Sequence, residues 1–170
     1  MSIPKGYSVR LFQPGDEVFL SAITQSAILS IGPRKYSQEQ VNAWAARHPS
    51  PARFVERAEA GARILVALAN PELRVAYALL EKDSAGDVHL DMLYCDPQHT
   101  RLGLSEALLA RAQACAHDYG AVRLYTEASE LARGAFERAG FAIQHRRDFT
   151  IEHEGRAIAI HNYAMEKRLD

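Results

Sequence analysis

Residues 92–112 read MLYCDPQHTRLGLSEALLARA, an apolar run that passes through Pro97 and a polar loop into a new pattern. From Leu104 to Tyr119 apolar residues recur at steps of three and four, which predicts a helix that ends at Gly120. A loop that opens directly into a helix presents free backbone N–H groups at the positive end of the helix dipole. The segment is therefore either an anion site or an ordinary strand-to-helix turn that binds nothing.

Two well-known phosphate motifs are absent from this loop. No Gly-Lys-Ser or Gly-Lys-Thr follows it, so it is not a nucleotide P-loop, and with Gly103 alone it lacks the dinucleotide fingerprint.

The segments on either side predict an alternation of strands and helices. A strand at 7–13 precedes two helices, the second capped by Ser37 and ended by Pro49 and Pro51. Three strands follow at 62–69, 74–81 and 86–95, then the helix from Leu104, a strand at 121–128, a helix capped by Ser129, and two strands that meet at Glu154-Gly155. The order predicts an α+β domain.

Composition favours a single domain over residues 1–170 that binds a small molecule. Lys and Arg total 20 against 21 Asp and Glu, so a net charge of -1 gives no general attraction to nucleic acid or to a membrane surface. No apolar run approaches the ~18 residues of a membrane span. We interpret Cys95 and Cys115 as reduced thiols of a cytoplasmic protein. No HExxH or CxxC spacing occurs, so no metal site is expected.

The segment around the loop resembles the GNAT superfamily of acyl-CoA N-acyltransferases. In that family a strand ends near a proline and is followed by Gln/Arg-x-x-Gly-x-Gly/Ala, whose amides hold the coenzyme A pyrophosphate. Here Thr100 stands in the Gln/Arg position, Gly103 matches the central glycine, and Ser105 replaces the last small residue.

A second segment, ASELARGAFERAGF at 128–141, is similar to the family's Asn-x-x-Ala-x-x-Phe-Tyr-x-x-x-Gly-Phe. Ser129 takes the Asn position, Ala132 the Ala position, and Gly140-Phe141 the last pair. The resemblance is specific over residues 88–141 and only architectural elsewhere.

The resemblance implies a GNAT fold, a twisted, mixed but mostly antiparallel sheet with helices on both faces, whose fourth and fifth strands diverge to admit acetyl-CoA. The oligomeric state, a monomer or a homodimer, is not indicated by any motif, although the long C-terminal strand at 157–166 would pair with a second chain if its edge is exposed. The residues expected to bind the coenzyme are Leu93, Tyr94, Cys95, Thr100, Arg101, Leu102, Gly103, Leu104, Ser105, Ser129, Ala132 and Phe136.

Two positions depart from the family pattern. Arg101 replaces a frequent glycine, so the loop must tolerate a Cβ there, and its guanidinium is itself a possible phosphate ligand. Phe136 falls where many members carry a tyrosine that protonates the departing thiolate, a role that phenylalanine cannot fill. Ser129, Tyr125 and Tyr163 are the alternative donors, and departure without an acid is a further possibility.

The strand at 88–95 carries the candidate bases. Alternation places Val88, Leu90, Met92 and Tyr94 on one face and His89, Asp91, Leu93 and Cys95 on the other. A buried aspartate needs a partner or a function, so Asp91 is the first candidate base and His89 the second, the competing interpretation being that Asp91 pairs with an arginine. A bulge expected near Leu93 would change these faces.

The resemblance further implies that a backbone amide of this strand, at Leu93 or Tyr94, binds the thioester carbonyl. Tyr36 and Trp44 lie in the region that covers the acceptor in this family, although Trp44 is equally suited to a core position. Glu127 and Asn162 are the other acceptor-side candidates.

The function that follows is direct transfer of an acetyl group from acetyl-CoA to a primary amine of a small molecule or peptide. The alternative is a domain that binds acyl-CoA without catalysis, as Phe136 and the altered loop would allow. The amine itself is not identified by any motif.

Overall fold

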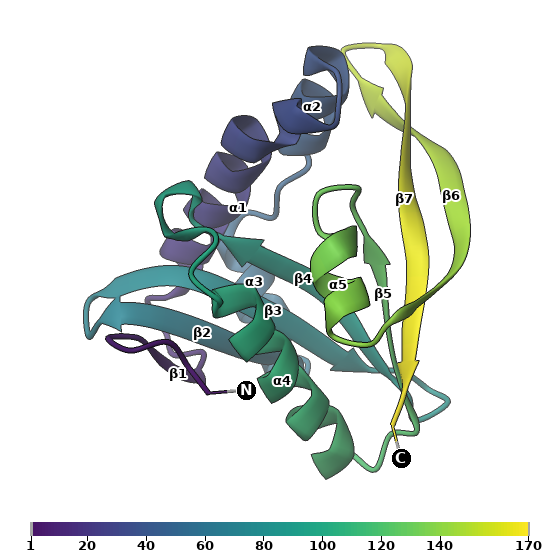
Figure 1. Ribbon diagram of the computed structural model, residues 1–170. Coiled ribbons are helices and arrows are strands. Elements are labelled where there is room, and N and C mark those ends of the chain that lie inside the picture. Colours follow the sequence, from purple (N-terminus) through teal and green to yellow (C-terminus); the bar gives the residue numbers. More distant parts are fainter. Residues whose placement is uncertain (1, 170) are drawn as a thin grey trace.

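The computed structural model describes residues 2–169 and contains one seven-stranded sheet (Figure 1). The strands follow the order β1-β2-β3-β4-β5-β7-β6, and every neighbouring pair is antiparallel except β4 with β5. Their bounds are β1 (Ser8–Leu11), β2 (Arg63–Asn70), β3 (Leu73–Lys82), β4 (Val88–Cys95), β5 (Arg123–Ala128), β6 (Ala142–His153) and β7 (Arg156–Arg168). The expected mixed, mostly antiparallel sheet is confirmed.

Helices cover both faces of the sheet (Figure 1). One face carries α4 (Leu104–Asp118) and α5 (Arg133–Arg138), which bury the apolar side chains of β2, β3 and β4 in the largest core cluster. The other face carries α1 (Glu17–Ile31), α2 (Gln38–Ala45) and α3 (Pro51–Glu59), and two short 3-10 turns lie at Gly32–Arg34 and Pro97–His99. No helix of the described chain is both long and apolar enough to cross a membrane.

Most predicted elements are present at their predicted places, with two corrections. The helix α5 begins at Arg133 with Ala132 at its N-cap, not with the expected cap Ser129. Ser37 and Gln40 form the reciprocal capping box at the start of α2. Pro49 and Pro51, however, do not lead directly into the first strand of the meander, because Pro51 occupies the first turn of the additional helix α3. A proline is tolerated there, since the first N–H groups of a helix have no intrahelical acceptor.

The C-terminal strand does not lie at the edge of the sheet. β7 pairs with β6 over Arg156–Glu166 and with β5 over Tyr163–Arg168. Before Tyr163, the carbonyls of Ala159 and His161 accept hydrogen bonds from Gln40 and Tyr36. β7 is therefore an inner strand, not the edge strand that was expected to pair with a second chain. The edge strand is β6, because the chain turns back at Glu154-Gly155 and lays β7 inside the sheet.

The central strands separate soon after they meet. β4 and β5 pair only at Val88 with Leu124 and at His89 with Tyr125, and β5 then continues beside β7 instead. The predicted divergence of these two strands is confirmed. The gap opens toward the end of β4 that leads into the loop before α4 (Figure 1).

A buried ion-pair cluster joins β1, β3 and α1. Asp16 is fully buried and contacts Arg10 at 2.6 Å and Arg74 at 2.8 Å, and it also accepts the backbone N–H of Gln13. Burial alone would raise the pKa of Asp16, but these hydrogen bonds outweigh burial and lower the pKa to about 2.

We expect Asp16→Asn to lower the free energy of unfolding by about 3 kcal/mol at pH 7, because it leaves two guanidinium groups without their counter-ion. The folded pKa of about 2 lies below the ordinary 3.8, so this stabilisation is present above pH 3.8 and is lost as the pH falls through 2. Urea unfolding measures both effects. Asp118→Asn, in an exposed ion pair of 3.7 Å, is the control and should change stability by less than about 0.5 kcal/mol. Equal losses in the two variants would contradict the assignment.

Candidate active site

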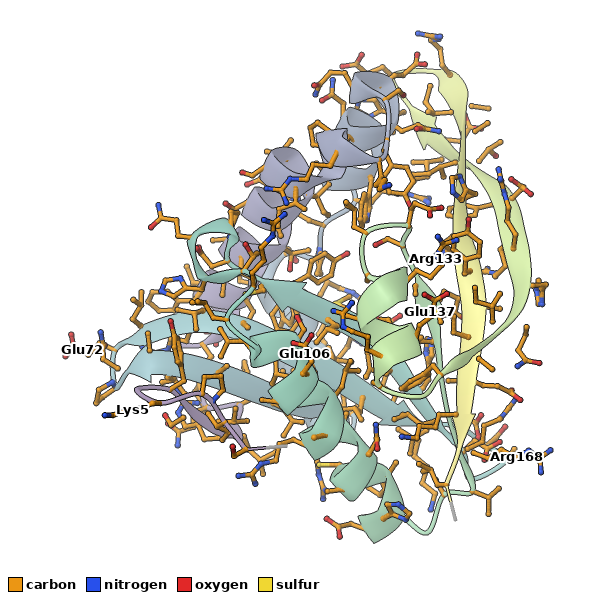
Figure 2. The ribbon with its side chains drawn as sticks, in the orientation of Figure 1. Lys5, Glu72, Glu106, Arg133, Glu137 and Arg168 are labelled. Carbon is orange, nitrogen blue, oxygen red and sulfur yellow. The ribbon has the colours of Figure 1, made fainter. Side chains whose placement is uncertain are left out.

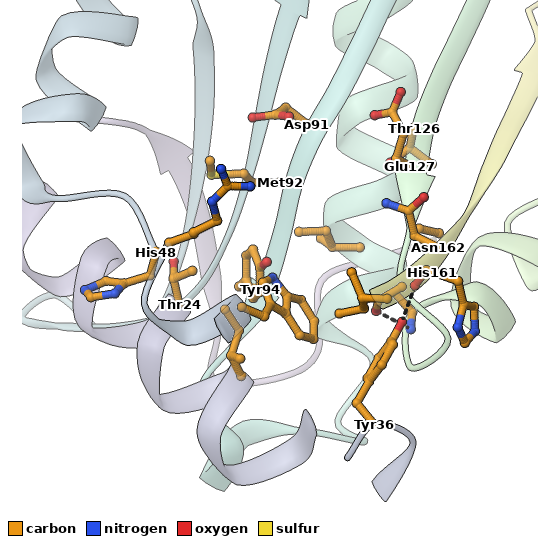
Figure 3. A pocket seen from close by; sticks show the side chains of 18 of the residues that line it. Thr24, Tyr36, His48, Asp91, Met92, Tyr94, Thr126, Glu127, His161 and Asn162 are labelled. Carbon is orange, nitrogen blue, oxygen red and sulfur yellow. Dashed lines mark hydrogen bonds between the residues drawn. The ribbon is translucent and has the colours of Figure 1, made fainter. Parts of the chain in front are cut away.

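A cleft of about 410 Å³ occupies the space between the diverging strands (Figure 3). Its walls come from α1, α2 and the turn after it, from β4, from β5 with the loop that leads to α5, and from the inner faces of β6 and β7. The cleft therefore brings together segments that are more than a hundred residues apart in the chain. Ten of the expected site residues line it directly: Tyr36, Trp44, Asp91, Leu93, Tyr94, Glu127, Ser129, Ala132, Phe136 and Asn162.

A bulge in β4 lies at Asp91, two residues before its expected place. Leu90 pairs with Leu80 and Met92 with Leu79, so Asp91 is an extra residue opposite β3. The bulge reverses the alternation beyond it. Leu93 joins the core beneath α4, whereas Met92 packs on the opposite face, toward α1 and α3.

The predicted faces of β4 are therefore correct before the bulge and wrong after it. Val88 and Leu90 do share the α4 face, but Met92 and Tyr94 do not join them, and Cys95 lies with Leu93 on the α4 face. A single added residue changes which side chains a strand presents together.

The same register directs backbone amides into the gap. Asp96 donates its N–H to the carbonyl of Val75 in β3 at 2.7 Å. Amide directions alternate along a strand, so the N–H groups of Leu93 and Cys95 point away from β3, toward the side that β5 has left. Of the two amides expected to face the thioester, that of Leu93 has the suitable direction and that of Tyr94 does not.

Asp91 is engaged by an arginine from α3. The guanidinium of Arg57 donates to Asp91 at 2.5 Å and to Glu81 of β3 at 2.7 Å, and it is only 17% exposed. This is the pairing that the competing interpretation of Asp91 anticipated. It holds the carboxylate at the cleft wall as an ion pair, with 29% of the side chain still accessible.

His89 of β4 and Glu127 of β5 form a second pair, at the point where the two strands stop pairing. Nε2 of His89 lies 2.5 Å from Oε2 of Glu127, and the imidazole stacks on Tyr125 with ring centroids 4.8 Å apart. Burial alone would lower the pKa of His89, but the hydrogen bond to Glu127 and the charges of Asp91 and Glu81 outweigh burial and raise it. The same hydrogen bond lowers the pKa of Glu127. Only Glu127 of this pair lines the cleft.

The aromatic pair from α2 and the turn before it closes one end of the cleft. Tyr36 and Trp44 meet edge to face at 5.6 Å. The Tyr36 hydroxyl donates to the carbonyl of His161 in β7 and accepts the N–H of Glu130. Both aromatic residues line the cleft and also pack in the core cluster between α2 and the β6–β7 hairpin, so Trp44 is a core residue as well as part of the cleft wall.

The loop before α4 has a strained backbone that exposes its amides. Arg101 has a φ of 63° and Gly103 a φ of 81°, so the loop accepts a Cβ at 101 in the left-handed region. Arg101 and Leu102 are exposed, Ser105 is half-buried, and the Leu104 side chain belongs to the core. The first three amides of α4, from Leu104 on, have no acceptor within the helix.

Two side chains of this region are engaged locally. The Thr100 hydroxyl donates to the carbonyl of Pro97 at 3.2 Å. The Cys95 thiol donates to the carbonyl of His99, and burial raises its pKa to about 12. Neither side chain is thus free for other chemistry, and the loop offers mainly backbone.

Of the three expected proton donors near the thiolate, one lines the cleft. Tyr125 donates to Asp83 and Tyr163 to Glu130, and neither belongs to the cleft wall. The Ser129 hydroxyl accepts the N–H of Ala132 and keeps its own proton, and it lines the cleft beside Ala132 and Phe136. Phe136 is buried against Phe141.

Sequence reasoning missed several basic residues. Arg57 lies on the helix that was not predicted. Of those that line the cleft, Arg47 and His48 lie in the turn after α2, and Arg147 and His161 lie on the inner face of the β6–β7 hairpin. The alternation of side chains along β6 and β7 assigns Arg147 and His161 to a face of the hairpin, but it does not predict which face lines the cleft.

Comparison with known proteins identifies the family. The model of the acetyltransferase (GNAT) domain matches residues 33–166. An uncharacterized N-acetyltransferase of Escherichia coli, YafP, is 32% identical over 133 residues, which cover 78% of this chain and 79% of that protein. The crystal structure of a GCN5-related N-acetyltransferase from Rhodopseudomonas palustris superimposes with a TM-score of 0.82 at 28% identity, over 99% of each chain. A putative acetyltransferase from Salmonella typhimurium, yncA, with acetyl-CoA bound, gives 0.73 at 19% identity over 96% and 94%.

We expect the pKa of His89, followed by NMR of the imidazole protons, to lie above 6.5 in the native protein. In Glu127→Gln the carboxylate that contributes most to the charged imidazole is gone and burial remains, so the pKa of His89 should fall below that of the native protein. Glu152→Gln on the exposed surface of β6 is the control and should leave the titration unchanged. An unchanged pKa in Glu127→Gln would show that the pair does not form in solution.

Proposed function

Because this chain belongs to the GNAT acetyltransferase family, it is an N-acetyltransferase, and we propose that acetyl-CoA enters the gap between β4 and β5 and acetylates a primary amine directly. The observation that carries this proposal is the separation of the two strands after His89, which leaves a cleft of about 410 Å³ beside unengaged amides of β4. An extended acyl-pantetheine chain supplies the hydrogen-bonding groups that a missing strand would supply.

The loop before α4 is the proposed pyrophosphate site. Its amides from Arg101 to Ser105 converge where the helix dipole is positive, an arrangement that favours a phosphate anion. Arg101 is exposed in this loop and adds a guanidinium. Leu93, Cys95, Ala132 and Phe136 would line the path of the pantetheine arm.

The amine must lose a proton before it attacks. With a pKa near 10.4, about 99.9% of a free alkyl amine is protonated at neutral pH. We assign the attraction of the ammonium group to Asp91 and Glu127, and the acceptance of its proton to Glu127 with His89 behind it. The Arg57 ion pair occupies Asp91, which favours the Glu127–His89 pair as the proton acceptor.

The remaining steps use groups beside the same gap. The Leu93 amide donates to the oxyanion that develops on the thioester carbonyl. The tetrahedral intermediate collapses by breaking the C–S bond, and the Ser129 hydroxyl, which keeps its proton in the cleft, is the proposed donor to the thiolate. Phe136 supplies packing only.

The rival function is binding of acyl-CoA without catalysis, which Phe136 favours. Titration of the protein with acetyl-CoA, desulfo-CoA and pantetheine in a calorimeter, followed by an amine panel assayed for free thiol release, separates the two. The proposed function requires micromolar binding that depends on the pyrophosphate half and release of thiol with an amine. Binding without release supports the rival, and no binding contradicts both.

We expect Gly103→Asp to weaken acetyl-CoA binding at least 10-fold, because a carboxylate would lie beside the pyrophosphate. Gly103→Asn is the matched control. It has the same size without the charge, and asparagine tolerates the left-handed φ of 81° better than most residues. The charge effect is the difference between the two variants by calorimetry, and circular dichroism verifies that both fold. Equal affinities would contradict a phosphate site in this loop.

We expect kcat/KM to rise with pH through the raised pKa of His89, because the pair accepts a proton only when the imidazole is neutral. Glu127→Gln should lower kcat/KM about 100-fold at neutral pH. The loss should become smaller at high pH, where the amine deprotonates unaided. Asp91→Asn should mainly raise KM for the amine and change kcat less. Glu152→Gln, away from the cleft, should leave the profile unchanged. A native profile in Glu127→Gln would remove the pair from the mechanism.

A further inference from the structure

Arg147 of β6 differs from the other half-buried arginines. It lines the cleft, and its guanidinium donates to the side-chain oxygen of Asn162 at 3.2 Å. Within residues 2–169 it forms no ion pair with a carboxylate. Every other half-buried arginine lies within 3.7 Å of a carboxylate: Arg10, Arg57, Arg63, Arg74, Arg123 and Arg133.

Asn162 adds a second donor to the same wall. Because its Oδ1 accepts from Arg147, its amide NH₂ points elsewhere, and in the described chain no protein acceptor takes it. A guanidinium and a carboxamide side by side present planar N–H groups of the kind that bind a carboxylate. The β6–β7 wall of the cleft is therefore cationic and rich in donors.

The facing wall is acidic. Asp91 and Glu127 line it from β4 and β5, and Glu127 does not reach Arg147 within the 4.0 Å of an ion pair. The charge of Arg147 nevertheless contributes to the lowered pKa of Glu127, after the hydrogen bond from His89. Arg147 and Glu127 thus interact across the cleft without forming an ion pair.

The rest of the cleft is largely apolar. The side chains between the two charged walls and the helices α1 and α2 are Tyr36, Trp44, Met92, Tyr94 and Phe149. Figure 3 shows Tyr94 and Met92 in this part of the cleft. These aromatic and aliphatic surfaces suit an uncharged side chain.

We propose that the acetyl acceptor is an α-amino acid with an apolar side chain, whose carboxylate binds Arg147 and Asn162 while its amine lies between Asp91 and Glu127. This inference rests on the proposed function and specifies its acceptor. The reacting nitrogen would be held on the acidic wall, and the carboxylate would neutralise the guanidinium that has no protein counter-ion.

The kinetic test compares phenylalanine with phenylalaninamide, which has the same shape without the negative charge. We expect the native enzyme to favour phenylalanine at least 10-fold in kcat/KM. Arg147→Gln should lower kcat/KM for phenylalanine about 10- to 100-fold and change that for the amide less than about 3-fold.

Two neighbouring arginines are the controls. Arg146→Gln removes the adjacent arginine of β6, which is exposed and paired with Asp148, and should leave both substrates unchanged. Arg47→Gln removes an exposed arginine at the cleft wall and should change the preference little. An equal loss on acid and amide in Arg147→Gln would mean that Arg147 acts only on the charge of Glu127, and would overturn the proposal, as would a loss of the preference in Arg47→Gln alone.

A binding measurement separates this proposal from the proposed function. Calorimetric titration of the CoA-loaded protein with N-acetylphenylalanine and with its amide does not require turnover. We expect the acid to bind at least 10-fold more tightly, and Arg147→Gln to abolish the difference. If no amine is acetylated yet the acid still binds through Arg147, the proposed function fails and the carboxylate site stands. If amines are acetylated and acid and amide bind equally, the carboxylate site fails alone.

Discussion

Two strands in the middle of the sheet share only two residue pairs, and this separation determines what the rest of the molecule can do. Beyond His89 the amides of β4 that point away from β3 have no strand to receive them. Backbone groups inside a fold need hydrogen-bond partners, so the gap is a site for a ligand or for water. Side chains of α1, α2 and α5 line the cleft that this gap leaves.

Charge is concentrated where the strands part. Glu81, Asp91 and Glu127 stand on three successive strands, with the guanidinium of Arg57 and the imidazole of His89 between them (Figure 3 shows Asp91 and Glu127 across the gap). The bulge at Asp91 places that carboxylate in the wall, and α3 supplies the arginine that holds it. By contrast, the charged side chains in Figure 2 around Glu106, Arg133 and Glu137 form pairs with one another and with their neighbours at the surface.

The sequence was sufficient for the strands, for α4 and for the loop at Gly103, because each depends on neighbours along the chain: alternation, a helical period, and a capping residue such as Ser37. It was not sufficient for the exact position of the bulge, which depends on how β4 fits against β3. The helix α3 was hidden because Pro51 is compatible with both a break and a first turn. Arg57 and Arg147 could not be assigned, since their partners lie 34 and 15 residues away in the sequence.

The two halves of the cleft differ in whether their residues are neighbours along the chain. This difference explains why the sequence predicts the coenzyme but not the amine. The proposed coenzyme half is built from two short segments, Leu93 to Ser105 and Ser129 to Phe136, so its motifs are contiguous and can be recognised. The proposed acceptor half combines α1, α2, β4, β5 and the β6–β7 hairpin. Its chemistry arises only when the hairpin brings Arg147 and Asn162 opposite Asp91 and Glu127. No local pattern carries that arrangement, and the choice of amine therefore has to be inferred from the folded protein.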